Sequence, residues 1–566
     1  MTNSPQTVCA LLEAASKRYG DRLAVIDGTL RMSYAELAAQ ARTMARALMA
    51  TGVQPGDRVA VWLPNTARWL IAALGAHSAG ASLVPMNTRY TGYEALDVLQ
   101  RTGARVLFLP DRFLGADYLT ALREAAAAQT EPAQQTEPAL QPGASGPVQG
   151  LPQLALAVRV PLASGDQPQG SSAAPEAAKG VTSWERMLAL ARETSEQSAR
   201  DRAAQVRPDD VADIIFTSGT TGVPKGAVSA HRQTVAVAAA WAERAKVTDR
   251  DVYMIIAPFF HTFGYKAGWV VALLCGATMV PQVTFDIDRV VDQIEREQVT
   301  ILPGPPTIFQ ELLAHPDRDK HDLSSLRLAV TGAAMVPVPL VERMRGELAF
   351  ETILTAYGLT EAVVVTMCLP GDDAQTISAT SGCAAAGFEI RIVGADGQEK
   401  EPGDDGEILL RGPNVMVGYL DDPQATRAAI GPDGWLHTGD IGRLDKRGYL
   451  TITDRLKDMF TVGGFNVYPA EVENVIMALK SVADCAVVGR PDERLGEVGL
   501  AYVVTGPGQS LSEQDVIAQC RQRLANFKVP REVVFVSKLP RNAGGKVLKR
   551  DLREQARQAL TTGSSS

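Results

Sequence analysis

Short apolar runs alternate with longer segments of helical periodicity near the start of this chain. Residues 35–50 carry apolar side chains at helical spacing, and 58–63 reads as a strand after the turn at 54–57. A small-residue helix is predicted over 72–81, followed by a strand at 82–85. Alternation of this kind is typical of parallel sheets covered by helices, so an α/β fold is predicted.

The chain is long enough for several such units. Its 566 residues correspond to about four domains at roughly 150 residues each. Hydrophobic residues make up 46% and charged residues 21%, which is ordinary for a globular protein. The formal net charge is −8, with both signs interspersed, so no basic footprint for a nucleic-acid partner is present.

The cysteines and the apolar segments indicate a reducing compartment. Six cysteines stand singly, without metal-ligand spacing: Cys9, Cys275, Cys368, Cys383, Cys485 and Cys520. The N-terminal residues lack the basic start and apolar core of a signal peptide. The longest apolar stretch, 267–281, is too short to span a bilayer. We expect a cytoplasmic protein without a transmembrane segment.

Composition divides the chain into two domains and two insertions. Residues 128–150 and 163–180 are rich in Pro, Gly, Ser, Gln and Ala, and are predicted to be disordered insertions on either side of a strand at 154–160. The N-terminal domain is predicted to span 1–456, and a compact α+β C-terminal domain to span 457–566. In the latter, helices are expected at 470–479 and 512–524, and strands at 483–488, 500–505 and 532–536.

The stretch TSGTTGVPKG, residues 217–226, follows the apolar run 211–216. Glycines between a strand and the next element expose backbone N–H groups to an anion, so the stretch predicts a phosphate loop. It is not a Walker loop, because Gly226 and not a hydroxyl residue follows Lys225, and because Pro224 precedes that lysine. Taken alone, the stretch is equally compatible with a flexible solvent-facing turn.

Further motifs follow in a fixed order: YGLTE at 357–361, TGD at 438–440, DRLKD at 454–458, GGFNVYP at 463–469 and PRNAGGK at 540–546. Together they make the chain, from about residue 8 to about 555, resemble the acyl-CoA synthetases of the adenylate-forming superfamily. That resemblance implies a large N-terminal domain of parallel-sheet α/β subdomains plus a β-barrel-like subdomain, with a small mobile α+β C-terminal domain. It implies ligation of a small-molecule carboxylic acid to coenzyme A, with ATP and Mg²⁺.

The resemblance also implies which residues hold the nucleotide. The β- and γ-phosphates would lie on Thr217, Ser218, Gly219, Thr220, Thr221, Gly222 and Lys225. Tyr357 would stack on adenine, opposite Gly332, Ala333 and Ala334, with Gly358 and Leu359 in the same segment. Thr360 would bind phosphate and Glu361 would hold Mg²⁺, the oxygen-loving cation usual on ATP. Asp440, assisted by Arg455, would accept hydrogen bonds from the ribose hydroxyls.

Two domain orientations are implied for the two chemical steps. Lys546 would reach the attacking carboxylate and the α-phosphate, and would withdraw when the small domain rotates about the hinge residue Lys457. Gly463 and Gly464 would then line the tunnel for the pantetheine thiol. His261 matches a gate beside the acyl pocket. The catalytic set implied by resemblance is therefore Lys546, Thr217, Lys225, Glu361 and His261.

Some alternatives remain open at this level. A Gly-Pro-rich turn usual in the family is replaced here by SGCAAAG at 381–387, which leaves the local loop shape open. The enzyme could load a carrier protein instead of CoA, or the chain could be a non-catalytic nucleotide-binding relative; a homodimer is also open. The local sequence around GGFNVYP resembles that of ligases that activate medium-chain or ring-bearing propanoates, including steroid breakdown intermediates.

Overall fold

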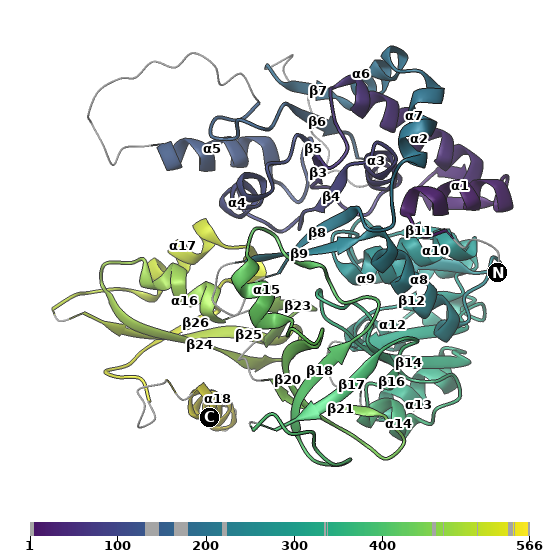
Figure 1. The fold of residues 1–566 in the computed structure, drawn as a ribbon. Helices are drawn as coiled ribbons and strands as arrows, with labels where there is room; N and C mark the ends of the chain where they lie inside the picture. Colours follow the sequence, from purple (N-terminus) through teal and green to yellow (C-terminus); the bar gives the residue numbers. More distant parts are fainter. Residues whose placement is uncertain are drawn as a thin grey trace, which may run out of the picture.

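The structure, a computed structural model, describes residues 5–130, 147–162, 179–217, 224–332, 336, 338–394, 396–455, 460–467, 469–506, 508–540, 547 and 549–563. Figure 1 shows a large unit, coloured purple to green, with a smaller yellow-green to yellow unit beside it. Where the chain is described, no helix is long and apolar enough to cross a membrane. All six cysteines are free thiols.

An eight-stranded sheet has the order β19-β9-β8-β4-β3-β5-β6-β7. Its strands are β3 (Arg58–Val61), β4 (Ser82–Pro85), β5 (Val106–Pro110), β6 (Leu156–Val160), β7 (Val181–Ser183), β8 (Val211–Thr217), β9 (Lys225–Ala230) and β19 (Gly418–Tyr419). Strands β3 to β8 pair in parallel, and β9 pairs antiparallel with β8. The parallel α/β fold predicted from the alternating pattern is confirmed.

The helices of this region are α2 (Tyr34–Ala50), α3 (Ala67–Ser78), α4 (Gly92–Thr102), α5 (Tyr118–Thr130), α6 (Trp184–Ala189) and α7 (Glu196–Ala204). Helix α3 begins five residues before the predicted 72, because the Thr66 side chain accepts a hydrogen bond from the backbone N–H of Trp69 and caps the helix there. Helix α5 continues to Thr130, so the start of the predicted insertion 128–150 is helical. Residues 131–146 and 163–178 lie outside the described residues.

A nine-stranded sheet has the order β16-β15-β14-β13-β12-β10-β11-β1-β2. Its strands are β1 (Leu23–Asp27), β2 (Leu30–Ser33), β10 (Val252–Ile255), β11 (Thr278–Pro281), β12 (Ile301–Pro303), β13 (Leu328–Gly332), β14 (Thr352–Tyr357), β15 (Thr366–Met367) and β16 (Cys383–Ala384). Neighbouring helices are α1 (Val8–Tyr19), α8 (His231–Ala245), α9 (Thr262–Gly264), α10 (Val270–Cys275), α11 (Ile287–Glu297), α12 (Pro306–Ala314), α13 (Val338–Glu347) and α14 (Ala374–Ala379). Strands β10 to β14 are parallel, so their carboxyl ends share one edge.

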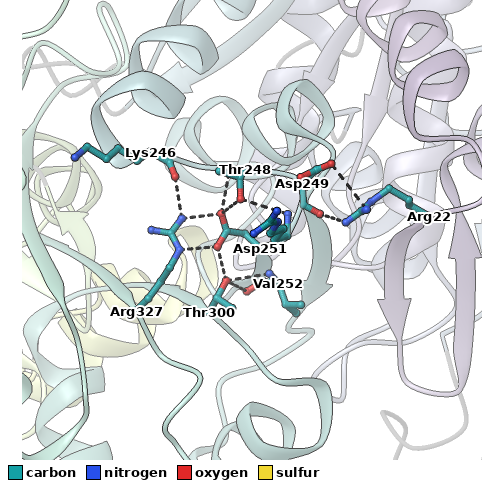
Figure 2. Close-up of polar contacts among 9 residues, drawn as sticks. Arg22, Lys246, Thr248, Asp249, Asp251, Val252, Thr300 and Arg327 are labelled. Carbon is teal, nitrogen blue, oxygen red and sulfur yellow. Dashed lines mark hydrogen bonds and ion pairs between the residues drawn. The ribbon is translucent and has the colours of Figure 1, made fainter.

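An ion cluster fixes the opposite edge of this sheet (Figure 2). Arg327 donates two hydrogen bonds to the Asp251 carboxylate, at 2.7 and 2.6 Å. The Thr300 hydroxyl donates a hydrogen bond of 2.8 Å to the same carboxylate. The backbone N–H of Thr248 also donates to it, at 2.7 Å. Burial alone would raise the pKa of Asp251, but these hydrogen bonds outweigh it and lower that pKa. The starts of β10, β12 and β13 are thereby held together, away from the edge where their carboxyl ends meet.

The β-barrel-like part of the prediction corresponds to a four-stranded antiparallel sheet, β17-β18-β20-β21. Its strands are β17 (Glu389–Val393), β18 (Gly406–Arg411), β20 (Leu436–Leu444) and β21 (Leu450–Arg455), and α15 (Pro423–Ala429) lies between β19 and β20 in the chain. Asp440 of β20 pairs with Arg455 of β21, which joins two of the sequence motifs through the backbone ladder.

The small unit has its own sheet and its own apolar core. Strands β22 (Phe460–Val462), β23 (Phe465–Val467), β24 (Val482–Asp492), β25 (Gly496–Thr505) and β26 (Glu532–Phe535) form the sheet, with helices α16 (Pro469–Met477), α17 (Glu513–Arg523) and α18 (Lys549–Gly563). The predicted order of helices and strands is confirmed. The proposed domain boundary, between 456 and 457, falls at 456–459, outside the described residues.

Candidate active site

A cavity of about 1920 Å³ opens where the carboxyl ends of β10 to β14 meet the small unit. Ligands of open α/β sheets bind in this position because the loops there are free to vary. Pockets for a single drug-sized ligand measure about 300–1,000 Å³, so this cavity has room for more than one ligand. Its walls come from both units of the protein, since Gly463, Gly464 and Arg494 line it together with residues of the large unit.

The predicted phosphate loop joins the two strands of a hairpin. Thr217 ends β8 and Lys225 begins β9, and the two are directly paired in the antiparallel ladder. Both residues line the cavity. The Thr217 hydroxyl donates to the Lys225 carbonyl oxygen at 3.4 Å. The loop is therefore closed at its base, while Ser218, Gly219, Thr220, Thr221 and Gly222 lie outside the described residues.

Tyr419 connects this hairpin to the YGLTE segment. The Lys225 ammonium lies 5.1 Å from the centre of the Tyr419 ring, a cation–π arrangement. The Tyr419 hydroxyl donates a hydrogen bond of 2.7 Å to Glu361 Oε1. Sequence reasoning missed Tyr419, since it stands in no recognised motif and reaches the cavity only because β19 pairs with β9. A cation, an aromatic ring and a carboxylate are thus brought together, with Thr360 beside them in the cavity wall.

On the other side of YGLTE, the structure brings Tyr357 and Asp440 together. The Tyr357 hydroxyl donates a hydrogen bond of 2.6 Å to Asp440 Oδ2. Both residues line the cavity, as do Gly358 and Leu359. This contact holds the hydroxyl end of Tyr357 against one oxygen of Asp440.

The residues facing the predicted adenine position fit a flat polar ligand. The Thr331 hydroxyl is buried and has no hydrogen-bond partner among the described residues, although Thr331 and Gly332 line the cavity. A side chain at Gly332 would come within 3.0 Å of the Ala356 carbonyl oxygen. One at Gly358 would collide with the Val363 backbone. Glycine is therefore required at 358, and at 332 it avoids a tight contact with the neighbouring strand. Ala333 and Ala334 lie outside the described residues.

Metal binding here would depend on a ligand. Among the described residues, no group of three or more His, Cys, Asp or Glu side chains could hold a metal ion. Mg²⁺ is usually held by one or two carboxylates together with substrate phosphates. A single carboxylate such as Glu361, next to Lys225 and the phosphate-loop hairpin, fits that mode of binding.

The other end of the cavity, beyond β10, β11 and β12, is mostly apolar. Its walls carry aromatic and aliphatic side chains: Trp241, Phe260, Phe263, Val283, Phe285 and Ile308. His261 also lines it and caps α9, since the backbone N–H of Phe263 donates to its Nδ1 at 3.2 Å. The ring is accessible from the cavity, but surrounding protein limits its hydration and lowers the pKa of His261 to about 4. His261 is therefore neutral at pH 7.

One buried amide stands out in this apolar end. Gln282 follows β11 directly, lines the cavity and is 4% exposed. Its Nε2 is buried and has no hydrogen-bond partner among the described residues. A buried donor left unpaired costs about 1–3 kcal/mol, so a ligand with an acceptor oxygen would relieve a real penalty. A lone glutamine outside any motif gave no signal in the sequence.

The small unit contributes a tight turn to the cavity. Gly463 and Gly464 have φ values of +55° and +84°, and Gly464 faces Pro305 of the large unit. Phe465 follows them and also lines the cavity. The other predicted residues of the small domain, the hinge Lys457 and the catalytic Lys546, lie outside the described residues, and of Arg455 only the backbone is described.

Comparison with known proteins places these features in a family. The family of AMP-binding enzymes matches residues 12–420, and the C-terminal domain of AMP-binding enzymes matches 471–546. A ligase of Rhodococcus jostii, named for 3-[(3aS,4S,7aS)-7a-methyl-1,5-dioxo-octahydro-1H-inden-4-yl]propanoyl:CoA, is 54% identical to this chain. The match covers 98% of this chain and 100% of that protein. A Mycobacterium tuberculosis ligase of the same name is 51% identical, again over 98% of this chain and 100% of that protein.

Two solved structures share the whole architecture. One is a double mutant of o-succinylbenzoate CoA synthetase from Bacillus subtilis bound with a CoA product analogue (28% identity, 96% of this chain and 98% of that one, TM-score 0.76). The other is ATP-bound MatB from Rhodopseudomonas palustris (29% identity, 97% and 98%, TM-score 0.64). Given the matched family, the relatives and the cavity, the chain belongs to the AMP-binding enzymes and is an ATP-dependent, AMP-forming acid–CoA ligase of the adenylate-forming superfamily.

Proposed function

We propose that this ligase activates a ring-bearing propanoate carrying ketone groups, of the kind named for its two relatives from Rhodococcus and Mycobacterium. The observation that carries the proposal is one cavity whose polar end meets the phosphate-loop hairpin and whose apolar end holds the unpaired amide of Gln282. A plain hydrocarbon chain would fill the apolar end but leave that amide unpaired.

The reaction proceeds in two displacements. A carboxylate oxygen of the acid attacks the α-phosphorus of ATP, forming the acyl-adenylate and releasing pyrophosphate. The CoA thiolate then attacks the acyl carbon, forming the thioester and releasing AMP. The first step gathers negative charge, which positive groups and a metal must offset.

We assign the roles of the polar residues from the positions of the described ones together with the sequence motifs of the family. Lys225 and Thr217 would hold the β- and γ-phosphates at the base of the hairpin, and Glu361 would supply a carboxylate ligand for Mg²⁺. Tyr419 orients both charged groups through its ring and its hydroxyl. Tyr357 lies against the adenine, and Asp440 accepts the ribose hydroxyls. Lys546 completes the first step from the small domain, and Gly464 leaves room for the thiol in the second.

An acid panel tests the substrate proposal. AMP formation is measured with the bicyclic diketo-propanoate, its analogue lacking both ring ketones, and dodecanoate. The diketo acid is expected to have the highest kcat/KM. In the variant Gln282→Leu, the preference for the diketo acid over its deoxygenated analogue should fall about fivefold to tenfold, since one neutral hydrogen bond is lost. Equal use of all three acids by the native enzyme contradicts the proposal.

CoA, and not a carrier protein, is the acceptor supported by the relatives, which are named for CoA thioesters. Release of AMP that depends on free CoA tests this, and AMP release only on addition of a carrier protein would contradict it. A dead nucleotide-binding relative is disfavoured because Lys225, Glu361 and Asp440 all line one cavity. We place the enzyme in the cytoplasm; the homodimer left open by the sequence is tested by light scattering on the purified protein.

A further inference from the structure

A buried lysine lies at the boundary between the large and small units. Lys528 ends the short helix Asn526–Lys528 of the small unit, and its side chain is 6% exposed. Its ammonium donates to Glu471 Oε1 of α16 at 2.7 Å and to Glu94 Oε1 of α4 at 2.8 Å. Glu471 belongs to the small unit and Glu94 to the large one, so Lys528 is a bridge between them.

Neighbouring contacts cross the same boundary. The Arg523 guanidinium lies 4.5 Å from the centre of the Tyr93 ring, and Lys528 lies 5.7 Å from that of Tyr90. The Thr91 hydroxyl donates to the Arg523 carbonyl oxygen at 3.2 Å. Thr91 and Glu94 also form the capping box that begins α4. The bridge is thus anchored to the rigid start of a helix (Figure 1, α4 and α17) and not to a loose surface side chain.

A short chain of contacts leads from this bridge to the cavity. Phe527, next to Lys528, stacks on Phe465 with the ring centres 4.8 Å apart. Phe465 follows directly on the Gly463–Gly464 turn, and all three residues of that segment line the cavity. Whatever fixes Lys528 against Glu94 therefore also fixes the position of this turn.

We propose that Lys528, held by Glu94, is a positioning residue for the thioester-forming step: it keeps the small domain where the Gly463–Gly464 turn lines the cavity. The inference rests on the proposed function, in which that turn leaves room for the thiol.

The second carboxylate explains how the bridge can open. Breaking a buried ion pair by removing one partner is costly because it leaves an uncompensated buried charge. When the small domain leaves Glu94, Lys528 keeps Glu471, which moves with it. The bridge can therefore favour one orientation of the small domain without trapping it there.

The variant Glu94→Gln tests the proposal with little risk to folding, because glutamine retains an oxygen for the capping box. Two half-reactions are measured with the bicyclic diketo-propanoate. Acid-dependent exchange of pyrophosphate into ATP reports the first, and loss of CoA thiol on addition of the synthetic acyl-adenylate reports the second. We expect the second to slow by about tenfold or more, and the first to stay within about twofold, a split that general damage to the fold would not give.

A further variant serves as a control. Glu297→Gln removes a similarly buried carboxylate that pairs with Arg31 at 3.0 Å, far from the domain boundary, and should leave both half-reactions unchanged.

The outcomes separate the two proposals. If the native enzyme exchanges no pyrophosphate with any acid of the panel, the proposed function fails. If the native enzyme carries out both steps and Glu94→Gln slows neither, or slows both equally, the positioning role of Lys528 is wrong.

Discussion

Two buried lysines in this protein differ in the number of carboxylates that pair with the ammonium group. Lys266 lies in the large unit and pairs with Asp213 at 2.9 Å, with side chains 1% and 0% exposed. Lys528 lies between the units and pairs with Glu94 and Glu471, where the exposed fractions are 6%, 11% and 7%. The first lysine has one carboxylate for its charge, and the second has two.

The number of carboxylates decides in which direction the pKa of each lysine moves. Burial lowers the pKa of Lys266 and raises that of Asp213, and their mutual attraction only partly offsets this. Burial alone would lower the pKa of Lys528 too, but the two glutamates outweigh it and raise that pKa. Lys528 therefore stays charged when it exchanges one partner for water.

We call the Asp213–Lys266 pair the fixed joint, because it lies within the large unit, and the contact of Lys528 with Glu94 the movable boundary, because it lies between the units. Asp213 is on β8, the strand that leads to the phosphate loop, and Lys266 is in the helical segment Tyr265–Trp269 that follows His261. The pair locks the nucleotide end of the cavity to its acid end, and it cannot part without burying an unpaired charge. Lys528 can leave Glu94 without that penalty, as a mobile domain requires.

The largest expected effect is at the fixed joint. Asp213→Leu leaves Lys266 buried without a partner and should lower the free energy of unfolding by about 3–5 kcal/mol, measured by urea denaturation. The double variant Asp213→Leu/Lys266→Leu removes both charges and should recover most of that loss. A single variant as stable as the native protein would show that the joint is not fixed by this pair.

At the movable boundary, Gly464→Leu should act on one step only. Its φ of +84° lies in the left-handed region, where leucine is strained, and a side chain there would extend past Pro305, whose Cγ lies 3.9 Å from the Cβ position, at the cavity wall. Thioester formation from supplied acyl-adenylate should fall by about 100-fold, while pyrophosphate exchange persists. Lys546→Ala should show the opposite split. Loss of the same half-reaction in both variants would contradict a two-orientation cycle.

Lowering the pH should reduce the free energy of unfolding through the buried His231 of the large unit. Burial lowers the pKa of His231 from 6.5 to about 4. Between these values the unfolded chain binds a proton that the folded protein does not, so stability falls as pH falls from about 6.5 to 4. At pH 5 this amounts to about 2 kcal/mol. In His231→Gln, the stability difference between pH 7 and pH 5 should shrink by that amount, and an unchanged difference would refute the assignment.

The smallest effect is expected where one partner is exposed. Arg31 is 43% exposed and pairs with Glu297, so solvent screens the interaction. Arg31→Ala should change the free energy of unfolding by no more than about 1 kcal/mol in the same urea assay. A loss as large as that of Asp213→Leu would mean that burial is not what distinguishes the fixed joint.

The sequence predicted the parallel α/β fold, the order of elements in the small domain and the polar end of the cavity. Those predictions depend on local patterns, since an apolar run, a glycine-rich loop and a motif such as YGLTE each lie within a few residues. The apolar pattern predicts the start of α3 at residue 72, after its true start at Ala67, because the capping residue Thr66 lies outside that pattern.

Other parts of the site depend on contacts between distant segments. Tyr419 meets Glu361 and Lys225 only because β19 joins the edge of the first sheet beside β9. Gln282 is unpaired only because the surrounding fold encloses it, and Glu94 meets Lys528 only in one orientation of two domains. No spacing in the chain encodes these distances.

By itself, the sequence determined the kind of chemistry, because phosphate loops and carboxylate motifs work through residues that are close in the chain. Tertiary structure alone decided which side chains share the cavity and how the small domain is held against it. The physical reason is that burial and pairing of charge are properties of surroundings, and those surroundings are assembled from segments far apart in the chain.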